Sequence, residues 1–151
     1  MPVLIVLLTC FFASLGITRI LSGNLEYLLC GNIAMCLMLC FTAIGHFKFP
    51  KGMQAMIPEK IPFRKELVII TGIIEIVAGI ALLFPFLRHT TGIFLIVFFI
   101  MILPANIHAA IRKIDYQKNS FDGKGTGYLW FRIPFQIFLI IWVWYFSVRP
   151  F

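Results

Sequence analysis

Acidic side chains are scarce in this chain, which has six Asp and Glu residues against thirteen Lys and Arg in a total of 151 residues. Charged residues of both signs make up only 13% of the sequence, whereas hydrophobic residues make up 61%. Soluble domains carry about 25% charged residues, and a chain of this length could not bury so much apolar surface in a water-soluble core. The composition therefore excludes an ordinary soluble domain and predicts an integral membrane protein.

Other features are missing as well. The chain has no C-x-x-C pair, no internal repeat and no tail of like charges. Its cysteines all lie inside apolar runs, which favours small packing residues over a thiol exchanger; they are Cys10, Cys30, Cys36 and Cys40. The net charge of +7 does not indicate nucleic-acid binding, because the basic residues sit in short segments between apolar runs.

Five apolar runs are long enough, or nearly so, to cross about 30 Å of hydrocarbon as helices. They cover residues 3–21, 25–47, 67–86, 90–111 and 129–148. Helices are expected because open strands leave backbone groups unpaired in lipid. The sequence thus predicts a single all-α transmembrane helical bundle over residues 1–151. The first run lacks a basic leader and a small-residue cleavage site, which favours a retained helix over a signal peptide.

The distribution of basic residues predicts the orientation of these spans. Three arginines, Arg19, Arg88 and Arg149, fall on one side of the membrane. Ten basic residues fall on the other side, with the N-terminus: Lys48, Lys51, Lys60, Arg64, Lys65, Arg112, Lys113, Lys118, Lys124 and Arg132. The excess predicts a cytoplasmic N-terminus in a cell membrane, here a bacterial inner membrane. Aromatic residues near the ends of the last run are expected as interfacial anchors: Trp130, Trp142, Trp144 and Tyr145.

The connection at residues 48–66 is not an ordinary polar loop. Pro50, Pro58 and Pro62 divide it into short pieces that also carry Phe, Met and Ile side chains. Such a segment is expected either to lie in the membrane interface and fold over the helix ends, or to be a surface linker without a role.

Five polar residues from four runs are expected in the cytoplasmic half of the membrane: His46, Glu75, Asn106, Arg132 and Gln136. At 1.5 Å per helical residue, Glu75 lies about 12 Å deep, Gln136 about 10 Å and Asn106 about 8 Å. A lone carboxylate at such depth is costly, so we expect the amide and guanidinium groups to neutralise Glu75. Gly72 and Gly79 share its helix stripe and predict a close neighbouring helix.

Two interpretations of this cluster remain open. It either holds the bundle together or forms a ligand-binding or proton-handling site. His46 is equally compatible with a neutral residue at a helix end. Pro104 is expected to bend its helix where Asn106 joins the cluster. His108 lies about 200° around the helix from Asn106 and is expected to face the headgroups. No metal site is expected, because one His and one Glu do not make three converging ligands.

Six short motifs from residue 45 onward resemble the DoxX-like family of small membrane proteins. They are GHF at 45–47, IPEKIP at 57–62, LVIITGIIE at 67–75, GIALLFP at 79–85, LPAN at 103–106 and LWFRIPFQ at 129–136. The resemblance covers about residues 28–144 and implies a four-helix core over residues 25–148, with residues 1–22 as an extra N-terminal helix. It carries over to His46, Glu75, Asn106, Arg132 and Gln136 as site residues.

The resemblance also implies a role beside quinone-linked or redox-protective membrane complexes, or in membrane-protein assembly. Our first hypothesis is a non-catalytic protein that binds a small amphipathic ligand, a quinone or a lipid, or serves as an accessory subunit of a membrane redox complex. The second is an isomerase or oxidoreductase on a lipophilic substrate, with Glu75 as the acid or base. A transporter is disfavoured by the small number of helices. The expected partners are the lipid bilayer and another membrane protein or a second copy of the chain, with no nucleic acid.

Overall fold

The structure, a computed structural model, describes residues 2–24, 26–115, 117, 118, 120–123 and 125–150, without the side chains of Ser22 and Tyr128. Leu25 and Lys124, which entered the predictions above, lie outside these residues. The described chain is helical and contains no strand, which confirms the all-α prediction. Its elements are α1 (Pro2–Ser22), α2 (Tyr27–Lys48), α3 (Pro50–Met56), α4 (Arg64–Ala81), α5 (Pro85–Ile111), the 3₁₀ turn η1 (Gly125–Tyr128), α6 (Leu129–Val143) and the π-helical turn η2 (Trp144–Val148).

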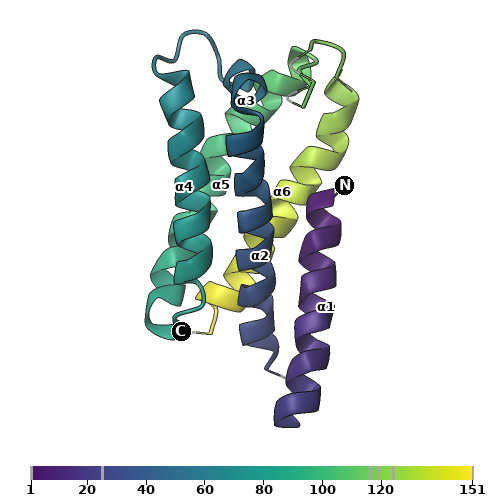
Figure 1. The fold of residues 1–151 in the computed structure, drawn as a ribbon, viewed down its shortest axis with the longest axis vertical. Helices are drawn as coiled ribbons and strands as arrows, with labels where there is room; N and C mark the ends of the chain where they lie inside the picture. The colour runs from purple at the N-terminus through teal and green to yellow at the C-terminus, as the bar shows by residue number, and fades with distance from the viewer. Residues whose placement is uncertain (1, 25, 116, 119, 124, 151) are drawn as a thin grey trace.

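Four helices in the described part of the chain are long and apolar enough to cross a membrane: α1, α2, α5 and the combined segment Gly125–Val148. These helices and α4 run side by side as a bundle (Figure 1). The 18 residues of α4 include four charged side chains, namely Arg64, Lys65, Glu66 and Glu75. Three of these occupy its first turn, so the rest of α4 is apolar except for Glu75 and Thr71.

The boundary between α4 and α5 differs from the prediction. The sequence placed Arg88 in a loop between runs at 67–86 and 90–111, but α4 ends at Ala81 and α5 begins at Pro85. Proline is favoured at the first helical position, since its missing N–H would have no helical partner there. Arg88 is therefore inside α5 and buried, and its Nε donates to the carbonyl of Leu82 at 3.0 Å. The arginine thus caps the end of α4.

The close approach of α2 to α4 depends on two glycines, as the sequence predicted. A Cβ added at Gly72 would lie 2.8 Å from Cβ of His46, and one at Gly79 would lie 3.3 Å from Cα of Cys36. Both contacts are with α2, and the second is with its backbone. The small residues of α4 therefore bring the helix that carries His46 against the helix that carries Glu75.

The opposite end of the bundle is held by a second set of buried polar contacts. Asn32 on α2 donates from Nδ2 to the carbonyl of Phe146 at 3.0 Å, and its Oδ1 accepts a hydrogen bond from Ser147 at 2.7 Å. Trp142 was expected as an interfacial anchor, and this prediction was wrong. Its side chain is buried and its Nε1 donates to the carbonyl of Gly31 at 3.1 Å, because α2 and α1 both cover this face of α6.

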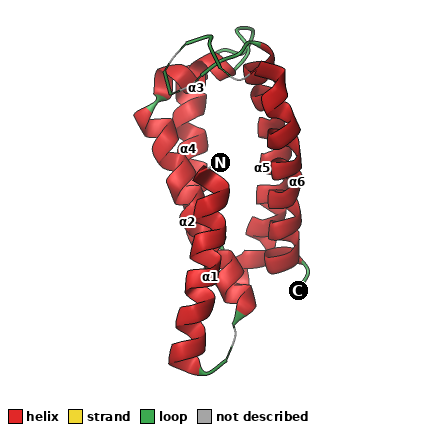
Figure 2. Ribbon diagram, turned by 90° about the vertical axis from the view of Figure 1, so that its right-hand side faces the viewer, coloured by secondary structure: helices red, strands yellow, loops and turns green. Residues whose placement is uncertain are grey.

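The helix α1 is displaced along the bundle toward the α4–α5 turn. It begins about midway along the other helices and extends beyond them (Figures 1 and 2). One strip of α1 contacts the core, where Leu7 is fully buried and the ring of Phe11 lies 5.0 Å from that of Trp142. The rest of its surface is largely exposed. This displacement leaves the first residues of α1 beside the interior of the bundle at the end where α2 meets α3.

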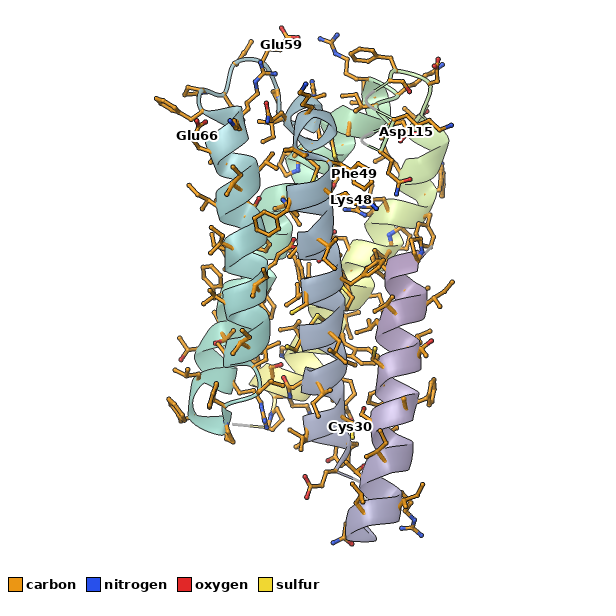
Figure 3. The ribbon with its side chains drawn as sticks, viewed as in Figure 1. Cys30, Lys48, Phe49, Glu59, Glu66 and Asp115 are labelled. Carbon is orange, nitrogen blue, oxygen red and sulfur yellow. The ribbon has the colours of Figure 1, made fainter. Side chains whose placement is uncertain are left out.

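The short helix α3 folds over the end of the bundle, which is one of the two expectations for the 48–66 connection. It follows α2 directly and lies across the ends of α4 and α5 (Figure 1). Glu59, Glu66 and Asp115 mark this end of the molecule, whereas Cys30 lies toward the other (Figure 3). His108, which the sequence directs away from the polar cluster, contacts the end of α3. Its Nδ1 donates to the carbonyl of Met56 at 2.9 Å and so fastens the end of α3 to α5.

Candidate functional site

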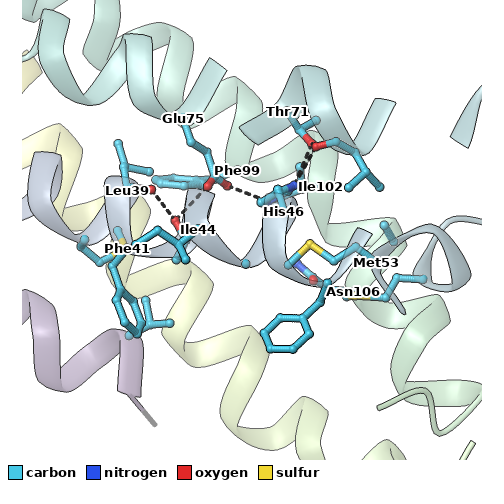
Figure 4. Close-up of a pocket in the computed structure, with 18 of the residues that line it drawn as sticks. Leu39, Phe41, Ile44, His46, Met53, Thr71, Glu75, Phe99, Ile102 and Asn106 are labelled. Atoms are coloured by element: carbon cyan, nitrogen blue, oxygen red, sulfur yellow. Dashed lines mark hydrogen bonds and ion pairs between the residues drawn. The ribbon is translucent and has the colours of Figure 1, made fainter. Parts of the chain in front are cut away.

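A pocket of about 360 Å³ lies beneath α3, between α2, α4, α5 and α6. All five polar residues selected from the sequence line it: His46, Glu75, Asn106, Arg132 and Gln136. Figure 4 shows His46 and Glu75 on facing helices with Thr71 nearby and Asn106 farther along the pocket. The depth estimate from helix rise therefore gathered side chains that do meet around one cavity.

The carboxylate of Glu75 does not pair with the residues that the sequence suggested. Its Oε2 accepts a hydrogen bond from Thr42 Oγ1 at 2.8 Å, and its Oε1 lies 3.5 Å from Nε2 of His46. Both partners belong to α2. The expected neutralisation by Arg132, Asn106 and Gln136 is wrong, because Gly72 and Gly79 place α2, and not α6, directly against this face of α4.

The imidazole of His46 is held by α4 in one tautomer. Its Nδ1 lies 2.9 Å from the carbonyl oxygen of Val68, and a carbonyl can only accept a hydrogen bond. Nδ1 therefore carries a proton. The hydroxyl of Thr71 lies 3.2 Å from the same nitrogen. The other ring nitrogen, Nε2, is left to face Glu75.

This tautomer determines the proton content of the His46–Glu75 pair. With Nδ1 protonated, a neutral ring presents a lone pair on Nε2, and an ionised carboxylate facing that lone pair would be repelled. One proton must therefore lie on Nε2 or on the carboxyl group. The pair is then either imidazolium with carboxylate or neutral imidazole with carboxylic acid. Its net charge is zero in both forms, and the proton can be exchanged with a bound molecule.

The polar groups of α5 and α6 form a second cluster on the pocket wall. Arg132 Nη2 donates to Oδ1 of Asn106 at 3.0 Å, and Gln136 Nε2 donates to the carbonyl of Phe99 at 2.7 Å. Asn106 is only 8% exposed. Its Nδ2 is fully buried and has no hydrogen-bond partner among the described residues. Buried amide donors are seldom left unpaired, so this nitrogen indicates a place for an absent acceptor.

Thr42 and Thr71 were not selected from the sequence, although both contribute directly to the site. Each precedes an identified residue by four positions on the same helix: Thr42 precedes His46, and Thr71 precedes Glu75. Residues with this spacing share a helix face, so the signal was present. A lone threonine in an apolar run more often bonds its own helix, which both hydroxyls also do.

The remainder of the pocket is apolar. Leu39, Ile102, Phe135 and Leu139 line its walls, Met53 and Met56 of α3 close it from above, and Val3 of α1 reaches it from the other side. Phe41 and Ile44 line it as well while being 40% and 58% exposed, so the cavity extends toward the outer surface of α2. Within the described residues, no group of three metal-ligating side chains is present.

These observations define an all-helical protein with four helices suited to crossing a membrane and a partly polar pocket at one end of the bundle. The chain belongs to a protein family described as a domain of unknown function, DUF8561, whose model matches residues 35–147. The match includes all five site residues and leaves out α1. Searches of curated proteins and of solved structures found no match.

Proposed function

We propose that the protein binds a small amphipathic ligand, a quinone or a lipid, in the pocket beneath α3. The observation that carries this proposal is the combination of a mostly apolar cavity with one buried amide nitrogen that has no acceptor in the described part of the chain. Ligand sites of this kind bind apolar bodies with their walls and orient them with a few polar groups. The proposal includes a DoxX-like relationship and a role as accessory subunit of a membrane redox complex. The sequence motifs that contain His46, Glu75, Asn106 and Arg132 support this part of it.

The proposed topology has five spans, with α4 crossing beside α2 and the N-terminus in the cytoplasm of a bacterial cell. The basic end of the bundle supports it. Lys48, Lys51, Arg64, Lys65 and Arg112 lie at the ends of α2 to α5 that surround α3, as the positive-inside rule requires of a cytoplasmic face. The site then opens in the inner leaflet, where a lipophilic ligand can reach it from the membrane.

The proposal is tested by native mass spectrometry of the purified protein followed by lipid extraction. Ala105 lines the pocket, so Ala105→Phe should fill part of the cavity without removing any of its polar or charged side chains. Met101 is 72% exposed and lies one turn away on the same helix, so Met101→Phe is a matched control. We expect wild type and Met101→Phe to carry the same amphiphile and Ala105→Phe to lose it. Equal ligand content, or none, in all three proteins would reject ligand binding at this site.

The fixed tautomer of His46 favours one alternative function, an isomerase or oxidoreductase in which Glu75 and His46 exchange a proton with a lipophilic substrate. A proton shared between two groups in a cavity is the arrangement that general acid–base catalysis requires. Incubation of the extracted amphiphile with the protein tests it. Turnover by wild type that disappears in Glu75→Gln would establish an enzyme, and unchanged ligand would leave a binding protein.

A further inference from the structure

The charges that line the pocket do not balance. The His46–Glu75 pair shares one proton and is neutral overall, as its hydrogen bonds require. Arg132 is positive, and no carboxylate of the described chain lies within 4.0 Å of its guanidinium. Lys48 adds a second positive charge at the rim, where its Nζ lies 5.5 Å from the ring centroid of Phe49. The pocket lining therefore carries an excess of positive charge, with the half-buried guanidinium of Arg132 on its wall and the exposed ammonium of Lys48 at its rim.

The orientation of the Asn106 amide is determined by Arg132. A guanidinium can donate hydrogen bonds but cannot accept them, so the amide oxygen and not the nitrogen must face Arg132 at 3.0 Å. Nδ2 then points away from Arg132, buried and without a partner among the described residues. A group that satisfies Nδ2 must be an acceptor, and the guanidinium that holds the oxygen of the same amide lines the same pocket.

We infer that the pocket holds a single-chain amphiphile with an anionic oxygen headgroup, a carboxylate or a phosphate monoester, bound by Asn106 and Arg132. This inference rests on the proposed function and narrows its ligand class. A neutral headgroup such as a quinone carbonyl would satisfy Asn106 Nδ2 but would leave the half-buried charge of Arg132 without a counter-charge. Charge-assisted hydrogen bonds from a guanidinium are roughly twice as strong as neutral ones, which favours the anionic headgroup.

The shape of the cavity indicates where the hydrocarbon chain of this amphiphile lies. A volume of about 360 Å³ is at the small end of ligand pockets and accommodates a headgroup with the first part of one hydrocarbon chain. Leu39, Phe135 and Leu139 provide the apolar wall. Phe41 and Ile44 line the cavity and are also exposed on the outer face of α2. The rest of the hydrocarbon chain therefore extends between them toward the lipid.

The test is equilibrium dialysis of delipidated protein in a neutral detergent against three ligands with the same chain: palmitate, hexadecyl phosphate and hexadecanol. We expect either anion to bind wild type at least about tenfold more tightly than hexadecanol, the factor expected for one charged hydrogen bond. The better of the two anions distinguishes a fatty acid from a phosphate lipid as the natural source.

Two variants and one control test the roles of Asn106 and Arg132 in binding the headgroup. Asn106→Asp is nearly isosteric, gives Arg132 a carboxylate partner and removes the free N–H, so anion binding should fall about tenfold or more while the fold is kept. Arg132→Gln should lower the affinity for both anions to that for hexadecanol and leave the affinity for hexadecanol unchanged. Arg112→Gln removes the same charge from an exposed position at the end of α5 and should change neither.

The possible failures are distinguishable. If hexadecanol and a short-chain ubiquinone bind wild type as tightly as palmitate, and Asn106→Asp has no effect, the anionic headgroup is rejected while ligand binding stands. If no amphiphile binds wild type more tightly than Ala105→Phe, the proposed function is rejected together with this inference.

Discussion

Nε2 of His46 on α2 faces Oε1 of Glu75 on α4 at 3.5 Å, with its other ring nitrogen bonded to the carbonyl of Val68. This relationship joins two helices and leaves one proton between them. It also separates the site into two parts, a neutral proton-sharing pair on α2 and α4 and a cationic cluster on α5 and α6.

Glu75→Gln should keep the free energy of unfolding within about 1 kcal/mol of wild type, because the new amide can donate to Nε2 and accept from Thr42. Glu75→Leu and His46→Leu should each lose about 1–3 kcal/mol, since each leaves a buried polar partner unpaired. Denaturant unfolding in micelles measures the differences. Nitrogen NMR of the imidazole should show a protonated Nδ1 in both wild type and Glu75→Gln. Equal losses for Glu75→Gln and Glu75→Leu would contradict the tautomer assignment.

Gly79→Leu should separate α2 from α4 and lower the melting temperature, because a Cβ there already lies 3.3 Å from the carbonyl oxygen of Cys36. Overpacking of this kind costs about 1–3 kcal/mol. Gly16→Leu in α1 is the control, since no atom of the described residues outside its own helix turn lies within 4 Å of its added Cβ. Thermal unfolding in the same detergent compares them. Similar melting temperatures for the two variants would show that the α2–α4 contact does not limit stability.

Ser147→Ala should destabilise the protein by about 1–3 kcal/mol, because it leaves the buried Oδ1 of Asn32 without its donor. Ser14→Ala removes a hydroxyl that is also buried, but its hydrogen bond among the described residues is to the carbonyl of Phe11 in its own helix. That control should cost less than about 0.5 kcal/mol, the usual range of substitutions away from such features. If both substitutions lower the free energy of unfolding by the same amount, the interhelical hydrogen bond of Ser147 stabilises the protein no more than the bond of Ser14 within its own helix.

His108→Ala should release α3 from α5 without unfolding the bundle. The substitution removes the donor to the carbonyl of Met56, so amide hydrogen exchange over residues 50–57 should accelerate while exchange in α2 stays unchanged. His108→Asn keeps a side-chain N–H near the position of Nδ1 and should restore protection. Unchanged exchange in His108→Ala would mean that other contacts hold α3 in place.

The five-span topology predicts that the two ends of α4 face opposite sides of the membrane. On a background without the native cysteines, Lys60→Cys should react with a membrane-impermeant reagent only from the cytoplasm, and Leu83→Cys only from outside. Gly23→Cys should behave like Leu83→Cys. Labelling of Lys60→Cys and Leu83→Cys from the same side would show that α4 does not cross, and exchange of the two sides would invert the orientation.

The sequence predicted the helical class and the site's members because both depend on hydropathy and on helix rise. Residues 46, 75, 106, 132 and 136 fall at similar depths whichever helices are neighbours, and all five line one pocket. The pairing of these residues depends on helix order and rotation, which composition does not determine. The sequence therefore places Glu75 beside Arg132, Asn106 and Gln136, whereas Gly72 and Gly79 direct it to Thr42 and His46.

The other errors have similar causes. Trp142 was judged by its distance from a membrane boundary, but α1 and α2 cover it and provide a carbonyl for its indole N–H. Arg88 was judged by its charge, but Pro85 starts a helix before it and the guanidinium caps α4. A backbone carbonyl accepts a hydrogen bond from each of these side chains and so allows it to be buried. The sequence does not show which carbonyl lies beside which side chain.

The π-helical turn at Trp144–Val148 gives the last span an unusual sensitivity to chain length. A π-turn contains one residue more than the α-helical turn that it replaces, and this extra residue brings Phe146 and Ser147 to face Asn32. A regular α-helix formed by the same residues would rotate the side chains that follow the turn by about 100°. The chain would keep its hydrophobicity and lose the fit of its C-terminal end, so lengths as well as residue types are constrained here.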